Sequence, residues 1–201
     1  MRPTNALLQC ENVKALVLYG SRWGGTVAVA QRIGQALSKE GLTVNILDAK
    51  KNPKNPEVFD LFVIGSGMRA DKWTKETLDF MEKNSKLLQT KKTALFVSCQ
   101  MADRAEPEVR EKAKKQYLQD TADQYGLKPI CFGFFGGFLD FKDSHGVIVD
   151  IMVRVNRKSL RRNGLDTTKV HDTRDWNNID AWARETANKA LQAIWLLAWS
   201  V

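Results

Sequence analysis

One short segment near the start of the chain constrains its fold more than any other. Residues 14–20 are mostly apolar and predict a buried strand, and the six residues after them are rich in hydroxyl groups and glycine. Apolar residues then recur at three- and four-residue spacing, which predicts a helix that runs to about Lys39 and stops at Gly41. The first amides of such a helix have no partner within it, so they can bind a phosphate. The segment therefore predicts a phosphate-bearing cofactor.

The turn between this strand and this helix departs from two common phosphate loops. It has neither the Gly-Lys-Ser/Thr ending of a nucleoside-triphosphate loop nor the three-glycine spacing of a dinucleotide-binding turn. It resembles the FMN-phosphate loop of flavodoxins, Ser/Thr-x-Thr-Gly-x-Thr, with Trp23 in place of a hydroxyl residue. An ordinary strand-to-helix turn is the alternative. The resemblance implies that the phosphate is bound by Ser21, Arg22, Trp23, Gly24, Gly25 and Thr26.

The order of the remaining elements favours an α/β fold, because strand patterns alternate with helix patterns. Further strands are predicted at 42–47, 60–65, 92–98 and 129–135, with helices at 74–88, 107–125 and 176–199. We expect one domain, residues 1–201, with a flavodoxin-like doubly wound three-layer sandwich. Its five-stranded parallel sheet should be followed by a helical insertion at about residues 136–166.

Two later loops are predicted to surround a flavin ring, because ligands of doubly wound folds bind at the carboxyl ends of the strands. They contain small residues, which expose backbone amides, and bulky residues that can pack on a flat ring. A cation such as Arg69 near the ring would raise its reduction potential, although a solvated loop arginine is an equal alternative. Trp73 is equally well explained as a core residue at a helix start. The predicted contacts are Ser66, Gly67, Met68, Arg69, Trp73, Ser98, Cys99, Gln100, Met101 and Asp103. No residue stands out as a general base.

The composition is that of a soluble globular protein, with 43% hydrophobic and 27% charged residues. No apolar run reaches the ~18 residues of a membrane span, and residues 1–11 do not resemble a secretory signal. The three cysteines are scattered and have no metal-ligand spacing, which is typical of a reducing cytoplasm. We therefore expect a cytoplasmic protein without a metal, in which Cys99 is a small buried residue rather than a redox group.

The net charge of +8 favours acidic proteins, anionic substrates or anionic membrane surfaces as partners; we expect no nucleic acid. A predicted helix at 147–162 begins apolar and ends with five basic residues. Such a segment could meet an anionic membrane surface or hold a large apolar substrate that carries carboxylates. A helix that covers one edge of the sheet is the alternative.

Over about residues 14–190 the chain resembles the flavodoxin-type, menaquinone-dependent protoporphyrinogen oxidases. Beside the phosphate turn and the insertion, the resemblance lies in residues 63–69, 165–169 and 174–184. It implies an FMN-dependent dehydrogenase that oxidises protoporphyrinogen IX and passes electrons to a quinone at the inner face of the cell membrane. Substrate propionates would then pair with Arg154, Arg157 and Lys158. Departures at Trp23, at 70–73 and at both ends of the chain set it apart from that family.

Two other functions stay open at this point. A flavodoxin electron carrier, which shuttles electrons between protein partners, would need only the flavin loops. A quinone reductase fed by a nicotinamide cofactor is the third, but the sequence contains no second nucleotide-binding motif. The apolar residues at 195–201 suit a homodimer contact, a lipid contact or burial within the monomer.

Overall fold

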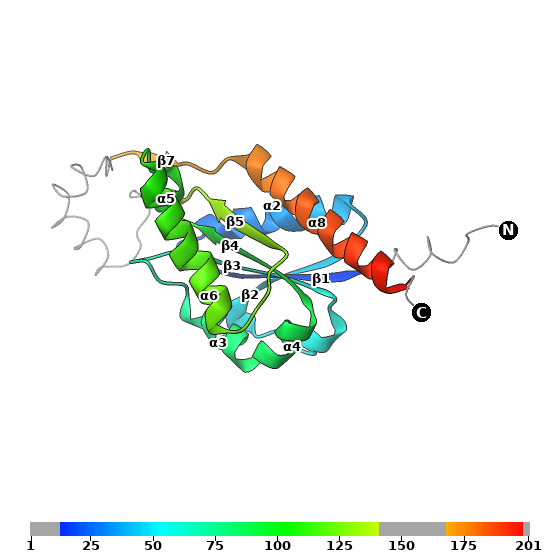
Figure 1. The fold of residues 1–201 in the computed structure, drawn as a ribbon. Helices are drawn as coiled ribbons and strands as arrows, with labels where there is room; N and C mark the ends of the chain where they lie inside the picture. The colour runs from blue at the N-terminus through cyan, green and yellow to red at the C-terminus, as the bar shows by residue number, and fades with distance from the viewer. Residues whose placement is uncertain (1–12, 141–167, 199–201) are drawn as a thin grey trace.

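The computed structural model describes residues 13–140 and 168–198, whose core is a five-stranded sheet. All four strand pairs are parallel, as the sequence predicted, and the strand order is β2-β1-β3-β4-β5. Figure 1 shows this sheet between two layers of helices. The strands are β1 (Lys14–Gly20), β2 (Thr43–Asp48), β3 (Leu61–Gly67), β4 (Lys92–Ser98) and β5 (Cys131–Phe135).

The helices form two layers, each with its own hydrophobic cluster against one face of the sheet. One layer consists of α2 (Gly25–Lys39) and α8 (Trp176–Ala198), which lie side by side (Figure 1). The other layer consists of α3 (Lys75–Lys83), α4 (Ser85–Thr90), α5 (Pro107–Lys114) and α6 (Asp120–Gln124). The predicted three-layer arrangement is therefore confirmed.

The segment from β1 to α2 folds as its pattern predicted. The centre of β1 is buried on both faces, as expected for a central parallel strand. Val29, Ile33 and Leu37 form the apolar stripe of α2 and are buried against the sheet. The helix ends at Lys39, and Gly41 has φ 90°, which is the left-handed conformation that glycine adopts readily after a helix.

Two predicted helices are less regular than their sequence patterns indicate. The helix expected at 74–88 is broken at Asn84, whose side-chain amide donates to the carbonyl of Phe80 at 2.9 Å. An asparagine that bonds the backbone in this way competes with continuation of the helix. The helix expected at 107–125 contains a π-helical turn, Lys115–Gln119, between α5 and α6. Tyr117 and Leu118 of this turn are buried under the sheet.

A second, small sheet follows β5. Its strands, β6 (Phe138–Asp140) and β7 (Val170–Asp172), pair antiparallel, and the sequence did not predict either. The helix predicted at 147–162, and with it Arg154, Arg157 and Lys158, lies outside the described residues. None of the described helices is long and apolar enough to cross a membrane.

Candidate functional site

A cleft opens at the carboxyl ends of β1, β3 and β4, beside the first turn of α2. Four segments that are distant in sequence meet there: the turn after β1, the loops after β3 and β4, and the start of β6. Two arginines line the cleft, and no acidic residue is among its described lining residues. The lining consists of Ser21, Arg22, Trp23, Gly25, Thr26, Gly67, Met68, Arg69, Ser98, Cys99, Gln100, Gly137, Phe138 and Leu139.

The turn after β1 presents the positive end of α2 to this cleft. Gly24 is the N-cap residue at φ 82°, and no side chain caps the described helix there. Thr26 is buried, and its hydroxyl lies against Gly67 of the neighbouring loop, because a Cβ added at Gly67 would come within 2.5 Å of Thr26 Oγ1. Hydroxyl groups and uncapped amides at a helix N-terminus form an anion site.

The loop after β3 makes a tight turn at the mouth of the cleft. Arg69 and Lys72 exchange two backbone hydrogen bonds of 3.1 Å, and the two residues between them, Ala70 and Asp71, both have positive φ. The guanidinium of Arg69 lies over the indole of Trp23, 5.1 Å from the ring centroid. The side chains of Trp23 and Arg69 therefore stack on each other at the rim of the cleft.

Trp73 faces the core instead of the cleft. Its side chain is buried beneath the loop, and its indole Nε1 donates to the carbonyl of Tyr117 at 2.8 Å. The Tyr117 hydroxyl in turn donates to the Asp71 carboxylate. Burial, and then this hydrogen bond, raise the pKa of Tyr117 above its usual value. The π-helical turn thus holds the loop after β3 through two hydrogen bonds. Trp73 is a core residue, which is the alternative that the sequence left open for it.

The loop after β4 lines the third side of the cleft. The Ser98 hydroxyl donates to the Gly136 carbonyl at 2.9 Å, and the Cys99 amide donates to the Phe135 carbonyl at 2.9 Å. Cys99 is only 6% exposed, and burial raises its pKa to about 11. Its thiol is therefore protonated at neutral pH, as expected of a structural residue. Gln100 Nε2 is buried and has no hydrogen-bond partner among the described residues.

The start of β6 forms a wall of the cleft that sequence reasoning missed. Phe138 packs directly on the first turn of α2, because a Cβ added at Gly25 would come within 3.1 Å of Phe138 Cβ. Beside it, the guanidinium of Arg174 lies over the Phe138 ring, 4.6 Å from the centroid. The available signal was the glycine pair Gly136-Gly137, since glycines directly after a strand allow close approach to a neighbour or a ligand.

The structure places five of the predicted contacts outside the lining of the cleft. Gly24 caps the helix, Ser66 and Trp73 are buried below the loop, and Met101 and Asp103 lie in a short 3-10 turn beyond it. For Ser66 the reason is the alternation of β3, which turns its hydroxyl toward the amide of Thr74, 2.9 Å away. The other predicted contacts from the first three loops meet at the cleft.

The chain matches the flavodoxin domain family over residues 16–159, and it belongs to that family. No curated protein matches it. Among solved structures, a flavodoxin from the domain Archaea superposes with a TM-score of 0.53 at 16% identity, covering 88% of this chain and 98% of that one.

Two further structures superpose equally well. A short-chain flavodoxin associated with a non-canonical PDU bacterial microcompartment gives 0.54 at 13% identity, covering 89% of this chain and 99% of that one. The rubredoxin oxygen:oxidoreductase of Desulfovibrio gigas gives 0.53 at 14%, covering 90% of this chain and 36% of that one. Likeness at such identities shows the fold, which is flavodoxin-like as predicted.

Proposed function

We propose that the cleft binds FMN and that the protein is an electron-transfer flavoprotein. Flavodoxins bind FMN, and the cleft has features that suit the negatively charged phosphate of FMN. The observation that carries the proposal is a combination found among the described residues: an uncapped helix N-terminus, two arginines, and a buried Gln100 amide without a partner there. None of the described lining residues is acidic. The described residues therefore fit a ligand with a phosphate and a polar heterocycle.

The residues divide into two groups by chemistry. Ser21, Arg22 and Thr26, together with the first amides of α2, would hold the phosphate. Met68 offers an apolar surface for a flat ring, and the Gln100 amide offers it a hydrogen-bond donor. When bound, FMN supplies the capacity to accept and release electrons, while the protein supplies its orientation and electrostatic surroundings. Arg69, a cation at the rim, would favour the negative charge that reduction adds.

For the electron donor and acceptor we propose protoporphyrinogen IX and a quinone. The support is the resemblance of residues 165–169 and 174–184 to protoporphyrinogen oxidases, together with the net charge of +8, which suits a substrate with two propionates. Arg154, Arg157 and Lys158 would bind those propionates, and residues 147–162 would meet an anionic membrane surface. In this proposal, the protein works at the inner face of the cell membrane.

One observation favours a second function, that of an electron carrier between protein partners. Among the described lining residues there is no aspartate, glutamate or histidine, and the pKa of the Cys99 thiol is about 11. The described part of the cleft thus offers no group suited to move a proton at neutral pH. A carrier needs no such group, because it only exchanges electrons.

The deciding experiment starts from the purified protein loaded with FMN. Protoporphyrinogen IX and a menaquinone analogue are added without oxygen, and porphyrin formation is followed by fluorescence. Quinone-dependent porphyrin formation would support the dehydrogenase. Bound FMN without turnover, but with electron exchange with a redox protein, would support the carrier. A protein that binds no flavin would refute both.

A conservative variant tests the phosphate site itself. Thr26→Val keeps the side-chain volume but removes the hydroxyl, so we expect FMN to bind about tenfold more weakly, as for the loss of one good hydrogen bond. Thr43→Val, the same change at an exposed position on the edge strand β2, is the matched control. Equal FMN affinities of the two variants would argue against a phosphate at this helix.

A further inference from the structure

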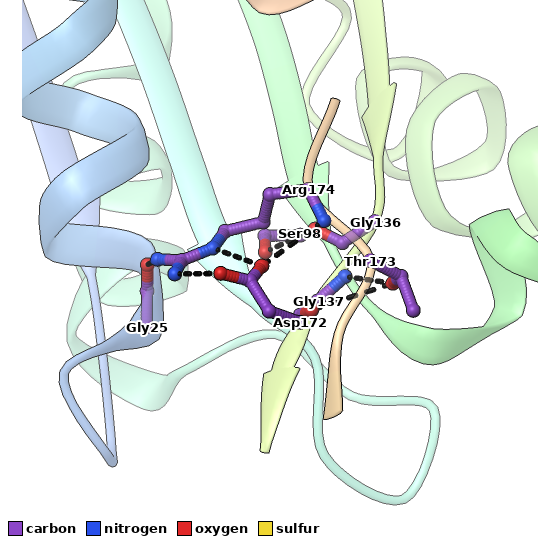
Figure 2. A network of polar contacts seen from close by, with 7 residues as sticks. All are labelled: Gly25, Ser98, Gly136, Gly137, Asp172, Thr173 and Arg174. Atoms are coloured by element: carbon purple, nitrogen blue, oxygen red, sulfur yellow. Dashed lines mark hydrogen bonds and ion pairs between the residues drawn. The ribbon is translucent and has the colours of Figure 1, made fainter. Parts of the chain in front are cut away.

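The side chain of Arg174 joins the C-terminal part of the chain to the first turn of α2 (Figure 2). Its Nη1 donates to the carbonyl oxygen of Gly25 at 3.3 Å, across a sequence separation of 149 residues. Gly25 is the first residue of α2 and lines the cleft. A residue distant in the sequence thus contacts the backbone at the anion-binding end of the helix.

The guanidinium of Arg174 is held from several sides. Nε and Nη2 form a forked pair of hydrogen bonds with the two carboxylate oxygens of Asp172, at 2.7 and 2.6 Å. Its central carbon lies over the rings of Phe138 and Trp176, 4.6 and 4.8 Å from their centroids. Only 10% of the side chain is exposed. An arginine fixed in this way presents its remaining N–H groups in one direction, which a flexible lysine would not do.

Arg174 does not act on helix α2 through its positive charge. A cation near a helix N-terminus opposes the helix dipole, and here the Asp172 carboxylate neutralises it. The hydrogen bonds from Arg174 also hold the pKa of Asp172 below its usual value, so the pair stays ionised at neutral pH. What remains is a geometrical constraint on Gly25 and on the Phe138 ring.

Thr173, the residue before Arg174, contacts the backbone of Gly137, directly before β6. Thr173 donates its amide to the Gly137 carbonyl at 3.0 Å, and its Oγ1 accepts from the Gly137 amide at 3.1 Å. Figure 2 shows these contacts beside the hydrogen bond from Ser98 to Gly136. Residues 172–174 therefore contact both the start of β6 and the start of α2. These two elements meet where Phe138, the first residue of β6, packs on Gly25, the first residue of α2.

We propose that Arg174 is a positioning residue for the phosphate end of the FMN cleft: it holds the first turn of α2 against Phe138, so that the helix amides keep the spacing a phosphate needs. This inference rests on the proposed binding of FMN. It assigns to Arg174 no contact with the cofactor, and it makes the segment after β7 part of the binding site.

The test compares FMN with riboflavin, which lacks the phosphate, by quenching of flavin fluorescence on titration with apoprotein. For Arg174→Ala we expect FMN to bind about tenfold more weakly, equal to about 1.4 kcal/mol, with riboflavin affinity nearly unchanged. Arg184→Ala is the matched control, because it removes the same charge from an exposed position on α8. We expect this control to bind both flavins as the wild type does.

Two more variants separate positioning from charge and from folding. Arg174→Lys keeps the charge and loses the fork, so we expect it to bind FMN as weakly as Arg174→Ala. Asp172→Ala should act in the same direction, and the double variant Asp172→Ala/Arg174→Ala should be no weaker than Arg174→Ala alone, since both residues belong to one unit. If Arg174→Ala does not fold, the inference is tested with Arg174→Lys and Asp172→Ala instead. The measured quantity is again the ratio of FMN affinity to riboflavin affinity.

Several results would overturn the inference. Equal weakening of FMN and riboflavin would mean that Arg174 only supports the fold, and full rescue by lysine would mean that it supplies charge. Unchanged FMN affinity in Arg174→Ala would refute it while leaving the proposed function intact. A wild-type protein that binds no FMN would refute the proposed function and this inference together.

Discussion

Burial of the Cys99 thiol predicts that this residue is chemically inert at neutral pH, although it lines the proposed cofactor cleft. Burial raises its pKa from 9.0 to about 11, and only 6% of the residue is exposed. Two pKa units lower the thiolate fraction about 100-fold at any pH well below both values. Since the thiolate is the reactive form, alkylation should be at least ~100-fold slower than in the unfolded chain.

Alkylation is best measured with Cys99 as the only cysteine. In the variant Cys10→Ala/Cys131→Ala, labelling by iodoacetamide is followed by mass spectrometry between about pH 7 and pH 10, in buffer and in concentrated guanidinium chloride. The folded protein should react slowly, and its rate should still be rising at the alkaline end. A folded protein that reacts as fast as the unfolded one would show that the thiol is neither buried nor raised in pKa.

The same shift makes stability depend on pH. The pKa is raised in the folded state, so the folded protein keeps this proton at pH values where the unfolded chain has lost it. Stability is then unaffected below about pH 9 and falls as the pH rises toward 11, by roughly 3 kcal/mol in all. The raised pKa of Tyr117 adds a loss of the same sign at still higher pH.

Urea unfolding of wild type and Cys99→Ala tests this second consequence. The difference in unfolding free energy between the two proteins should shift in favour of the alanine variant between about pH 8 and pH 11. The comparison removes most of the contribution of Tyr117, because burial and the Asp71 hydrogen bond, the largest causes of its raised pKa, are present in both proteins. Parallel stability curves over that range would contradict the reasoning.

Three further predictions concern the end of β3 and the loop after it. Trp73→Phe removes the buried 2.8 Å hydrogen bond to the Tyr117 carbonyl and should lower the unfolding free energy in urea by about 1–3 kcal/mol; an unchanged value would show that water reaches this carbonyl. Gly67→Ala places a Cβ 2.5 Å from Thr26 Oγ1, so a strain of about 1–3 kcal/mol should disturb the cleft and weaken FMN binding in a fluorescence titration. Ala70→Gly relieves a residue at φ 46° and should raise the melting temperature, because a left-handed alanine costs about 1–2 kcal/mol and the added freedom of the unfolded chain offsets only part of it. A lower melting temperature would show that this turn is not strained.

Local patterns predicted most of the sheet because the spacing of apolar residues within each strand and helix shows which of its faces is buried. Four of the five strands are short apolar runs between turn residues, the partly exposed edge strand β2 alternates, and α2 ends where Gly41 follows it. The turn after β1 could be predicted to line the cleft for the same reason, since its glycines and hydroxyl residues lie within six positions of the sequence. The two irregular helices were not predicted from the hydrophobic pattern. The break at Asn84 comes from a local bond between its side chain and the Phe80 carbonyl, which that pattern does not report. The π-helical turn at 115–119 buries Tyr117 and Leu118, and this burial depends on packing against the rest of the fold.

The sequence by itself thus determined the doubly wound sheet and the loops that meet at its carboxyl edge, because hydrophobic period and turn chemistry act between neighbours in the chain. Only the tertiary structure decided that Trp73 points into the core, where the Tyr117 carbonyl accepts its N–H. It alone also paired β6 with β7, two strands of three residues each with no pattern of their own. That pairing brings Arg174 to Gly25, a contact set by long-range packing and charge rather than by local sequence.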